Sequence, residues 1–129
     1  MSQPILRVAR PTNDIERVAD FYTAGLGFDV LAHFEDHDGF DGVIVGRPGC
    51  QWHIEFTHQH DVMVDDAPTT EHLLVLYLPD RDEWNAAVAG LHALGVTPVR
   101  SENPYWDHHG MTFEDPDGYR IVLQNAAWG

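Results

Sequence analysis

The side chains best suited to chemistry lie in one stretch near the C-terminus, Asn103-Pro104-Tyr105-Trp106-Asp107-His108-His109-Gly110. Tyr105 and Trp106 lie beside Pro and Gly on an expected loop, which suits a lid that stacks on a flat ligand. The alternative is that the two rings plug one end of the fold. His108 and His109 add imidazole nitrogens that could bind a divalent metal. This loop is therefore a candidate ligand-binding segment.

Other polar residues are less informative. His58 and His60, beside Asp61, have a spacing that metal ligands use, but on a polar linker such a pair usually marks a solvated loop. A metal bound there would be adventitious. Asp115 and Asp117 are assigned to turn geometry and not to catalysis. The sequence contains no Ser-His-Asp context, no phosphate-binding Gly-rich loop and no dinucleotide fingerprint.

The segment 111–125 predicts two strands joined by the tight turn Asp115-Pro116-Asp117-Gly118. Asp115 can accept hydrogen bonds from the turn backbone, Pro116 pre-sets φ, and Gly118 tolerates a positive φ. After the turn, apolar and polar residues alternate with the period of a strand that has two different faces. This hairpin is expected to close the chain.

The rest of the chain predicts two similar halves. Strands are expected at 5–9, 29–35, 43–46 and 51–58, with a helix from Asp14 to Leu26-Gly27. In the second half we expect strands at 72–78 and 97–100 and a helix that begins at Asp80 or Asp82 and ends at Leu94-Gly95. Matching offsets between the helices suggest duplication. The prediction is one α+β domain, 1–129, of tandem βαβββ half-units (about 1–60 and 70–129) with about eight strands, joined by a linker at 59–70.

Burial is also predicted. The run 72–78 is almost continuously apolar, as a strand buried on both faces would be. The buried stripe of the second helix is expected to consist of Trp84, Ala87, Val88, Leu91 and Leu94.

Composition excludes several classes of protein. A hydrophobic content of 43% argues against intrinsic disorder. The formal net charge of -14, with 7 Lys+Arg, argues against nucleic acid and anionic membranes as partners. Cys50 is the only cysteine, so no internal disulfide can form. The N-terminus lacks a basic segment followed by an apolar run, and no long apolar stretch occurs elsewhere. We expect a soluble cytoplasmic protein.

Taken together, these motifs resemble the vicinal oxygen chelate superfamily of glyoxalases, extradiol dioxygenases, fosfomycin-resistance enzymes and bleomycin-resistance proteins. The matching residues run from Asp14-Ile15-Glu16-Arg17 through Phe21-Tyr22 to Leu26-Gly27-Phe28, and include Asp115-Pro116-Asp117-Gly118. The resemblance implies an incomplete barrel with two outer helices, a ligand cavity inside it, and a homodimer. It does not choose a reaction, because one fold can carry many chemistries.

The resemblance also implies positions for a metal site. Members that bind a divalent metal hold it with residues from the first, fourth, fifth and last strands, and these positions fall on Arg7, Glu55, His72 and Val122. A guanidinium has no lone pair for a metal, and valine has no donor. The usual site is therefore expected to be lost, and no cofactor is expected.

The remaining polar residues allow more than one interpretation. Arg7 and Glu55 would face the same cavity, either as a pair that only holds the sheet or as an anchor in which Arg7 binds a carboxylate or phosphonate. His53 shares a strand face with Glu55. His72 is either structural, a polar contact, or an acid/base near neutral pH.

Two functional hypotheses follow. Under the first, the protein binds a small aromatic or anionic molecule without a metal, as the bleomycin-resistance branch sequesters ligands; its candidate binding residues are Arg7, His53, Glu55, His72, Tyr105, Trp106 and Val122. Under the second, it is a divalent-metal-dependent lyase, isomerase, transferase or dioxygenase that holds Zn, Ni, Fe or Mn. The metal ligands would then be Glu55 and His72 with one of His53, His108 or His109.

Overall fold

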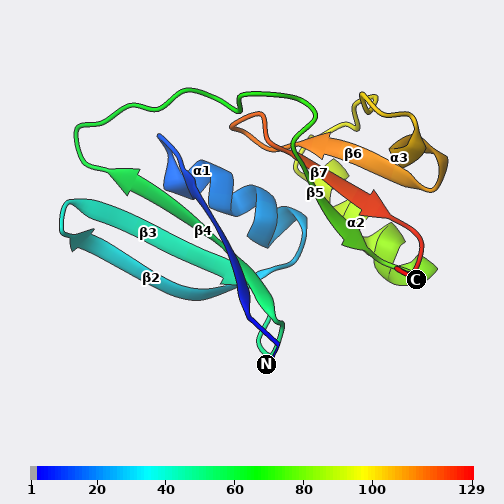
Figure 1. Cartoon of the computed structure of the whole chain (residues 1–129), viewed down its shortest axis with the longest axis horizontal. Coiled ribbons are helices and arrows are strands. Elements are labelled where there is room, and N and C mark those ends of the chain that lie inside the picture. The colour runs from blue at the N-terminus through cyan, green and yellow to red at the C-terminus, as the bar shows by residue number, and fades with distance from the viewer. Residues whose placement is uncertain (1–2) are drawn as a thin grey trace. The chain divides into compact units, whose positions relative to one another are not determined.

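A computed structural model describes residues 3–129, which form two compact units. Unit 1 contains the chain up to Thr23 together with Gly27–Val64, and unit 2 contains Ala24–Leu26 together with Asp65–Gly129. Each unit consists of an open β-sheet and helices (Figure 1). The predicted α+β class is confirmed.

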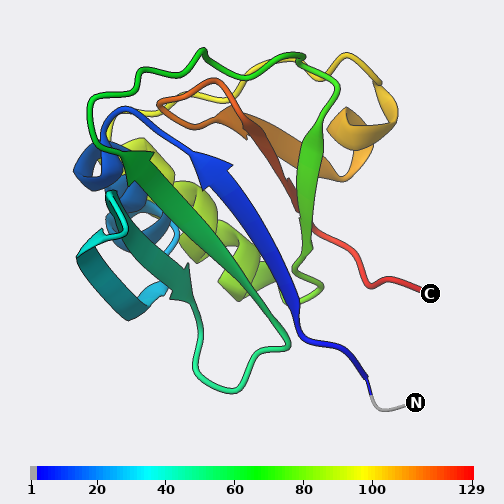
Figure 2. The ribbon, with the colours of Figure 1, turned by 60° about the vertical axis from the view of Figure 1, so that its left-hand side comes forward.

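Unit 1 follows the predicted βαβββ order. Its sheet has the strand order β1-β4-β3-β2, in which β1 pairs parallel with β4 and the other pairs are antiparallel (Figure 2). The elements are β1 (Leu6–Pro11), α1 (Ile15–Asp20), a π-helical turn η1 (Phe21–Gly25) whose last two residues belong to unit 2, β2 (Asp29–His37), β3 (Phe40–Gly46) and β4 (Trp52–Gln59).

The first helix begins where the sequence predicts and then changes its pitch. The Asp14 side chain accepts a hydrogen bond from the Arg17 backbone N–H at 3.1 Å, which satisfies one of the free donors of the helix start. The single helix expected to Leu26 is wrong, because α1 ends after six residues and continues as η1. Tyr22 in η1 is fully buried, with its ring 5.1 Å from that of Phe56 on β4. Packing of this ring on the sheet accompanies the wider turn.

Unit 2 has the strand order β5-β7-β6. Its elements are β5 (Leu73–Tyr77), α2 (Arg81–Ala93), a short α3 (Tyr105–His108), β6 (Gly110–Glu114) and β7 (Arg120–Gln124). Asp80 caps α2 by accepting hydrogen bonds from two backbone N–H groups, at 2.8 and 3.1 Å. The Trp84 indole N–H donates to the Leu123 carbonyl oxygen at 2.8 Å, which holds α2 against the central strand.

Three expectations for unit 2 are wrong. The strand at 97–100 is reduced to one bridge, between Val99 and Thr112, next to a proline that has no backbone N–H to donate. The described residues therefore form seven strands and not eight. The apolar strand β5 is only half-buried, because it is an edge strand, whereas all five residues of the central strand β7 are buried. Leu94, expected in the buried stripe of α2, is 45% exposed, and Ala87 is only half-buried.

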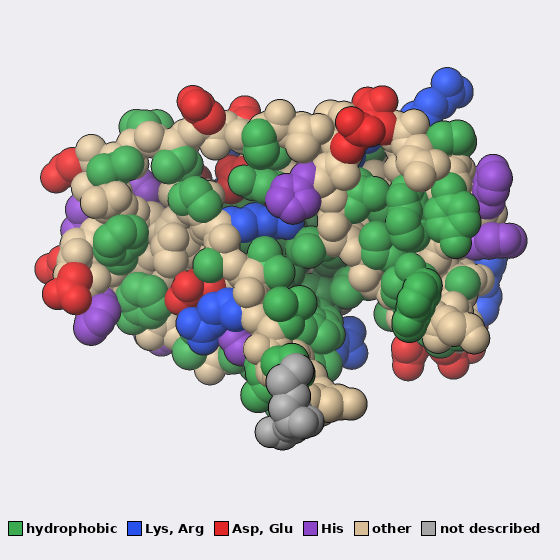
Figure 3. Space-filling view, viewed as in Figure 1, with side chains coloured by type: hydrophobic (Ala, Val, Ile, Leu, Met, Phe, Trp, Pro, Cys, Tyr) green, Lys and Arg blue, Asp and Glu red, His purple; other side chains and the backbone are tan. Residues whose placement is uncertain are grey.

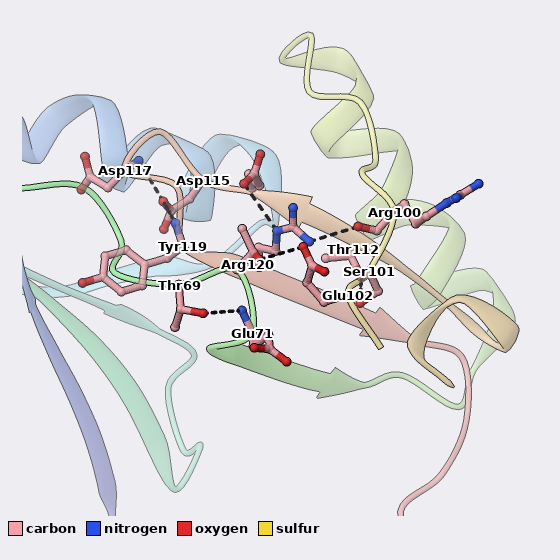
Figure 4. Close-up of polar contacts among 12 residues, drawn as sticks. Thr69, Glu71, Arg100, Ser101, Glu102, Thr112, Asp115, Asp117, Tyr119 and Arg120 are labelled. Carbon is pink, nitrogen blue, oxygen red and sulfur yellow. Dashed lines mark hydrogen bonds and ion pairs between the residues drawn. The ribbon is translucent and has the colours of Figure 1, made fainter. Parts of the chain in front are cut away.

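The turn between β6 and β7 is confirmed. The Asp115 carboxylate accepts hydrogen bonds from the backbone N–H groups of Asp117 and Tyr119, at 2.9 and 3.1 Å (Figure 4). Gly118 has a φ of 84°, in the left-handed region that glycine tolerates. Among residues 3–129, no helix is long and apolar enough to cross a membrane.

Candidate functional site

Three of the predicted site residues, Arg7, His53 and Glu55, meet on the sheet of unit 1 and are called the Arg7 cluster. The register of β1 with β4 places Arg7 opposite His53, two residues before Ala9, which faces Glu55. The Arg7 Nε–H donates to His53 Nε2 at 2.8 Å, and Arg7 Nη1 lies 3.7 Å from Glu55 Oε2. Because a guanidinium can only donate, His53 Nε2 must be the acceptor, and a neutral His53 carries its proton on Nδ1.

The Arg7 cluster lies on the sheet face opposite α1. The neighbouring residues Ile54 and Phe56 point to the α1 face and are 3% and 1% exposed, whereas the side chains of Arg7 and Glu55 are 48% and 15% exposed. Arg7 Nη2 has no partner among residues 3–129. The cluster therefore presents a guanidinium edge that is held in place by two β4 side chains and can still bind an anion.

Sequence reasoning missed the apolar side of this face. The pairing of β2 with β3 shifts register between Val30 and Ala32, and Leu31 lies at this bulge. A Cβ placed on Gly46 would come within 3.2 Å of the Leu31 side chain, so Leu31 reaches across the face next to the Arg7 cluster. A Cβ on Gly42 would overlap the ring of Phe34 in the same way.

Between these two glycines lies Ile44, which is half-buried and pairs with Glu55 of β4. We call Leu31, Phe34 and Ile44 the apolar wall. The alternate glycines of β3, Gly42 and Gly46, could have indicated this wall in the sequence. Glycine inside a strand often marks a bulge or the close approach of another group.

The other predicted site residues belong to unit 2. His72 is exposed just before β5, and its ring centroid lies 6.4 Å from that of Tyr119. Tyr105 and Trp106 form an edge-to-face pair on α3 with centroids 4.9 Å apart, and Tyr105 is 58% exposed. His108 ends α3 and His109 follows it, both exposed, while Val122 is fully buried in β7.

The loop that carries the aromatic pair is anchored at its base. Arg120 Nη1 donates to the Arg100 carbonyl oxygen at 3.0 Å, and the Thr112 hydroxyl donates to the Ser101 hydroxyl at 3.2 Å (Figure 4). Arg120 is 8% exposed and lies 3.4 Å from a Glu114 carboxylate oxygen. Arg120 was not among the predicted site residues, since an arginine in an alternating strand ordinarily faces solvent.

A second ionic group in unit 1 lies outside the Arg7 cluster. His60 Nε2 lies 2.8 Å from Asp41 Oδ1, which also accepts a hydrogen bond from the Asp36 backbone N–H at 2.9 Å. The backbone bond from Asp36, followed by the bond to His60, holds the pKa of Asp41 below its usual 3.8. The bond to Asp41 raises the pKa of His60 above 6.5. This pair joins β3 to the chain that leaves β4.

The positions that hold a metal in the fold family lack suitable donors in this chain. Arg7 and Val122 offer no lone pair, and the Nε2 lone pair of His53 accepts the hydrogen bond from Arg7. Within either unit of residues 3–129, no three His, Cys, Asp or Glu side chains gather in a way that could hold a metal ion. These side chains do not fit the metal set that the fold family implies.

On the face shown in Figure 3, hydrophobic side chains are exposed over much of the surface, with acidic side chains toward its margins. The most exposed large apolar residues of unit 1 are Ile5, Leu6, Val30 and Met63.

Comparisons with known proteins agree with this fold. Residues 6–57 match the model of the YycE-like N-terminal domain, and residues 71–125 match that of the YycE-like C-terminal domain. The uncharacterized protein YycE of Bacillus subtilis is 40% identical over 121 residues, which cover 94% of this chain and 87% of that protein.

Solved structures extend the comparison. The crystal structure of a YycE protein of unknown function from Bacillus subtilis, grouped with glyoxalase and fosfomycin resistance proteins, has a TM-score of 0.86 and 41% identity, and covers 95% of this chain and 89% of that one. TnmS3, an antibiotic binding protein from Streptomyces sp. CB03234, has a TM-score of 0.66 and 29% identity over 96% of this chain and 95% of its own.

The trypanothione-dependent glyoxalase I of Leishmania major shares the fold, with a TM-score of 0.74 and 23% identity over 97% of this chain and 88% of its own. The family is shown by the YycE relative and by the two domain models, which together span both units. This chain belongs to the YycE-like family of the vicinal oxygen chelate superfamily.

Proposed function

We propose that this protein binds a small molecule with an anionic group and an aromatic or apolar body, without a resident metal. The observation that carries the proposal is the Arg7 cluster. Its guanidinium is fixed by His53 at 2.8 Å and lies 3.7 Å from Glu55, yet its side chain is 48% exposed. A fixed, accessible guanidinium edge is suited to a carboxylate or phosphonate.

The loss of the metal is part of this proposal. Where relatives would place a metal, this chain has a permanent cation, and the two β4 side chains that could be ligands both point at it. A divalent ion beside Arg7 would meet a like charge and would compete for the His53 lone pair. The half-buried Glu55 is better matched by the guanidinium already present.

Similarity supports a binding role and does not select a reaction. TnmS3, which shares 29% identity with this chain, is an antibiotic binding protein, and binding alone needs no catalytic group. The glyoxalase I relative shares only 23% identity, so it supports the fold and not the activity. Within unit 2, the aromatic pair Tyr105 and Trp106 is proposed as a separate candidate contact for a flat ligand.

The first test is elemental analysis of the purified, tag-free protein after dialysis against a mild chelator. We expect Zn, Ni, Fe and Mn only at trace level. Near-stoichiometric metal that disappears in the His72→Ala or Glu55→Gln variant would refute the metal-free hypothesis. It would support the alternative, a divalent-metal-dependent lyase, isomerase, transferase or dioxygenase.

The second test uses calorimetry to compare the affinity of small aromatic acids for the wild-type protein and for the Arg7→Leu variant. Removing the guanidinium should weaken binding at least about tenfold, since a charged hydrogen bond contributes about 1.5–3 kcal/mol. Arg47→Leu is the matched control, because Arg47 is an exposed arginine of the same unit in the turn after β3. Equal affinities for the Arg7 and Arg47 variants would refute the role of Arg7.

We also propose a cytoplasmic homodimer. The single cysteine, Cys50, is compatible with a reducing compartment. Exposed apolar residues of unit 1, among them Ile5 at 67% and Leu6 at 60%, would gain burial in a second copy. Sedimentation equilibrium at micromolar concentration measures the oligomer directly, and a concentration-independent monomer would contradict the dimer.

A further inference from the structure

We propose that the apolar wall sets the ligand class of the Arg7 cluster: a monocarboxylate whose ring or branched apolar body lies on Leu31 and Ile44. This inference rests on the function proposed above and adds which body and which charge the site accepts. It makes Leu31 of β2 a specificity element, although β2 is an edge strand that carries no polar site residue.

Alternation along β2 places Leu31 on this face. Val30 pairs with Val45, whose side chain is buried on the α1 face, so the next residue, Leu31, points to the opposite face, where Glu55 lies. The register shift lets Ala32 pair with Ile44 on the same face, so two successive β2 residues lie on this side of the sheet. The Leu31 side chain reaches over Gly46.

Two glycines make room for the wall. With any larger residue at Gly46, the new side chain would contact both Leu31, at 3.2 Å from its Cβ, and the Cβ of His53, at 3.3 Å. The surface between Leu31 and His53 would then be filled. Because glycine is present, the Leu31 side chain can lie over the β3 backbone beside His53, which brings the apolar wall next to the Arg7 cluster.

The spacing of the strands limits the size of the ligand body. Gly46, His53 and Arg7 form one row across β3, β4 and β1, so the wall above β3 lies two strand spacings, roughly 10 Å, from β1. The long Arg7 side chain spans several ångströms of this interval. What remains matches one aromatic ring or a branched chain attached to a carboxylate.

Charge limits the ligand to a single negative group. Arg7 and Glu55 balance each other, and Arg7 Nη2 is the donor without a partner among residues 3–129. One carboxylate can occupy that donor. A second carboxylate would face Glu55 and a chain of formal net charge -14, whereas an amine would face the guanidinium.

The test measures affinity by calorimetry for five probes: phenylacetate, indole-3-acetate, acetate, the dianion terephthalate and the cation benzylamine. Phenylacetate and indole-3-acetate should bind at least about tenfold more tightly than the other three. Leu31→Asp should then remove most of this preference, and Gly46→Val should weaken binding of both aryl acids by filling the surface between Leu31 and His53.

Val30→Asp is the matched control for Leu31→Asp. Val30 is 53% exposed on the same edge strand and pairs with Val45, whose side chain is buried on the α1 face. Far-UV circular dichroism confirms folding of each variant, and Leu31→Asn replaces Leu31→Asp if the charged variant is unfolded. Both positions are exposed, so both variants should fold.

The outcomes separate this inference from the proposed function. Loss of aryl-acid binding in Leu31→Asp but not in Val30→Asp supports the wall. If Arg7→Leu weakens binding while the Leu31 and Val30 variants behave alike, the wall is wrong and the proposed function stands. If acetate binds the wild type as tightly as phenylacetate does, the inference about the wall is also wrong. If no carboxylate binds the wild type, both the wall and the proposed function are wrong.

Discussion

Replacing Gly90 with alanine tests how α2 packs in unit 2. In a helix interior alanine is favoured over glycine by about 1 kcal/mol, so helix propensity alone predicts that Gly90→Ala stabilises the protein. The contacts predict the reverse. A Cβ on Gly90 would overlap the Gly25 carbonyl oxygen and lie 3.2 Å from its carbonyl carbon. Both are backbone atoms, which cannot rotate away.

The two effects differ in size. Overpacking a close contact costs about 1–3 kcal/mol, and a clash with rigid backbone lies toward the upper end of that range. After the gain of about 1 kcal/mol from propensity, the free energy of unfolding should fall by about 2 kcal/mol. Urea unfolding followed by far-UV circular dichroism measures this difference.

Two matched variants make the interpretation specific. A Cβ on Gly25 would meet the ends of the Leu91 and Leu94 side chains, at 2.7 and 3.0 Å, so Gly25→Ala should cost less because those tips can shift. Asn85→Ala, at an exposed position of α2, should stabilise by a few tenths of a kcal/mol to about 0.7. If Gly90→Ala is as stable as the wild type or more stable, the close approach of α2 to Gly25 is wrong.

Three further predictions concern single hydrogen-bonding groups. Asp115→Ala should lower the free energy of unfolding by about 1–3 kcal/mol, because two turn N–H groups lose the acceptor that lies 2.9 and 3.1 Å away. Trp84→Phe should cost about 1–3 kcal/mol, because a buried β7 carbonyl loses the indole donor at 2.8 Å; both losses are read from urea unfolding. His60→Gln should destabilise mainly between about pH 4 and 6.5. Because folding raises the pKa of His60, its contribution to stability is complete below pH 6.5 and is lost as the pH rises through the raised pKa. Because folding lowers the pKa of Asp41, its contribution is complete above pH 3.8 and is lost as the pH falls through the lowered pKa. Thermal unfolding across this pH range measures the effect.

Each of these predictions has an internal control. Asp115→Asn keeps an acceptor and should cost less than Asp115→Ala. Trp128→Phe, at a side chain that is 84% exposed, should leave stability unchanged. A His60→Gln effect that is equal at pH 5.5 and pH 8.5 would show that the ion pair with Asp41 is not its source.

Local hydrogen-bond chemistry explains what could be predicted of the fold. Asp14 and Asp80 were readable as helix caps, and the Asp115 turn as a turn, because each depends on a side chain and the few backbone groups beside it. Strand neighbours depend on the whole chain. A continuous apolar run does not reveal which strands flank it, so the edge strand β5 was assigned a burial that belongs to β7.

The same distinction applies to polar residues within strands. β7 alternates in sequence, yet Arg120 and Gln124 are both buried, at 8% and 3% exposed. Arg120 is accepted there because a carbonyl oxygen at 3.0 Å and a carboxylate oxygen at 3.4 Å receive its N–H groups. Nothing in the period-2 pattern indicates such partners, since they come from the loop before α3 and from β6.

At the candidate site, the family resemblance indicated Arg7 and Glu55 but could not give the interaction between Arg7 and His53. That interaction requires the parallel register of β1 with β4, which is set by a pairing of residues 46 positions apart in the chain. The wall is harder still, because it depends on the pairing of β2 with β3 and on how far the Leu31 and Phe34 side chains reach over β3. In the sequence, the wall is indicated by Gly42 and Gly46. Glycine inside a strand weakens packing unless another group occupies the space above it, and here Phe34 and Leu31 occupy that space. A sequence search for the apolar side of this site should therefore start from the alternate glycines of β3 and not from the exposed edge strand that fills them.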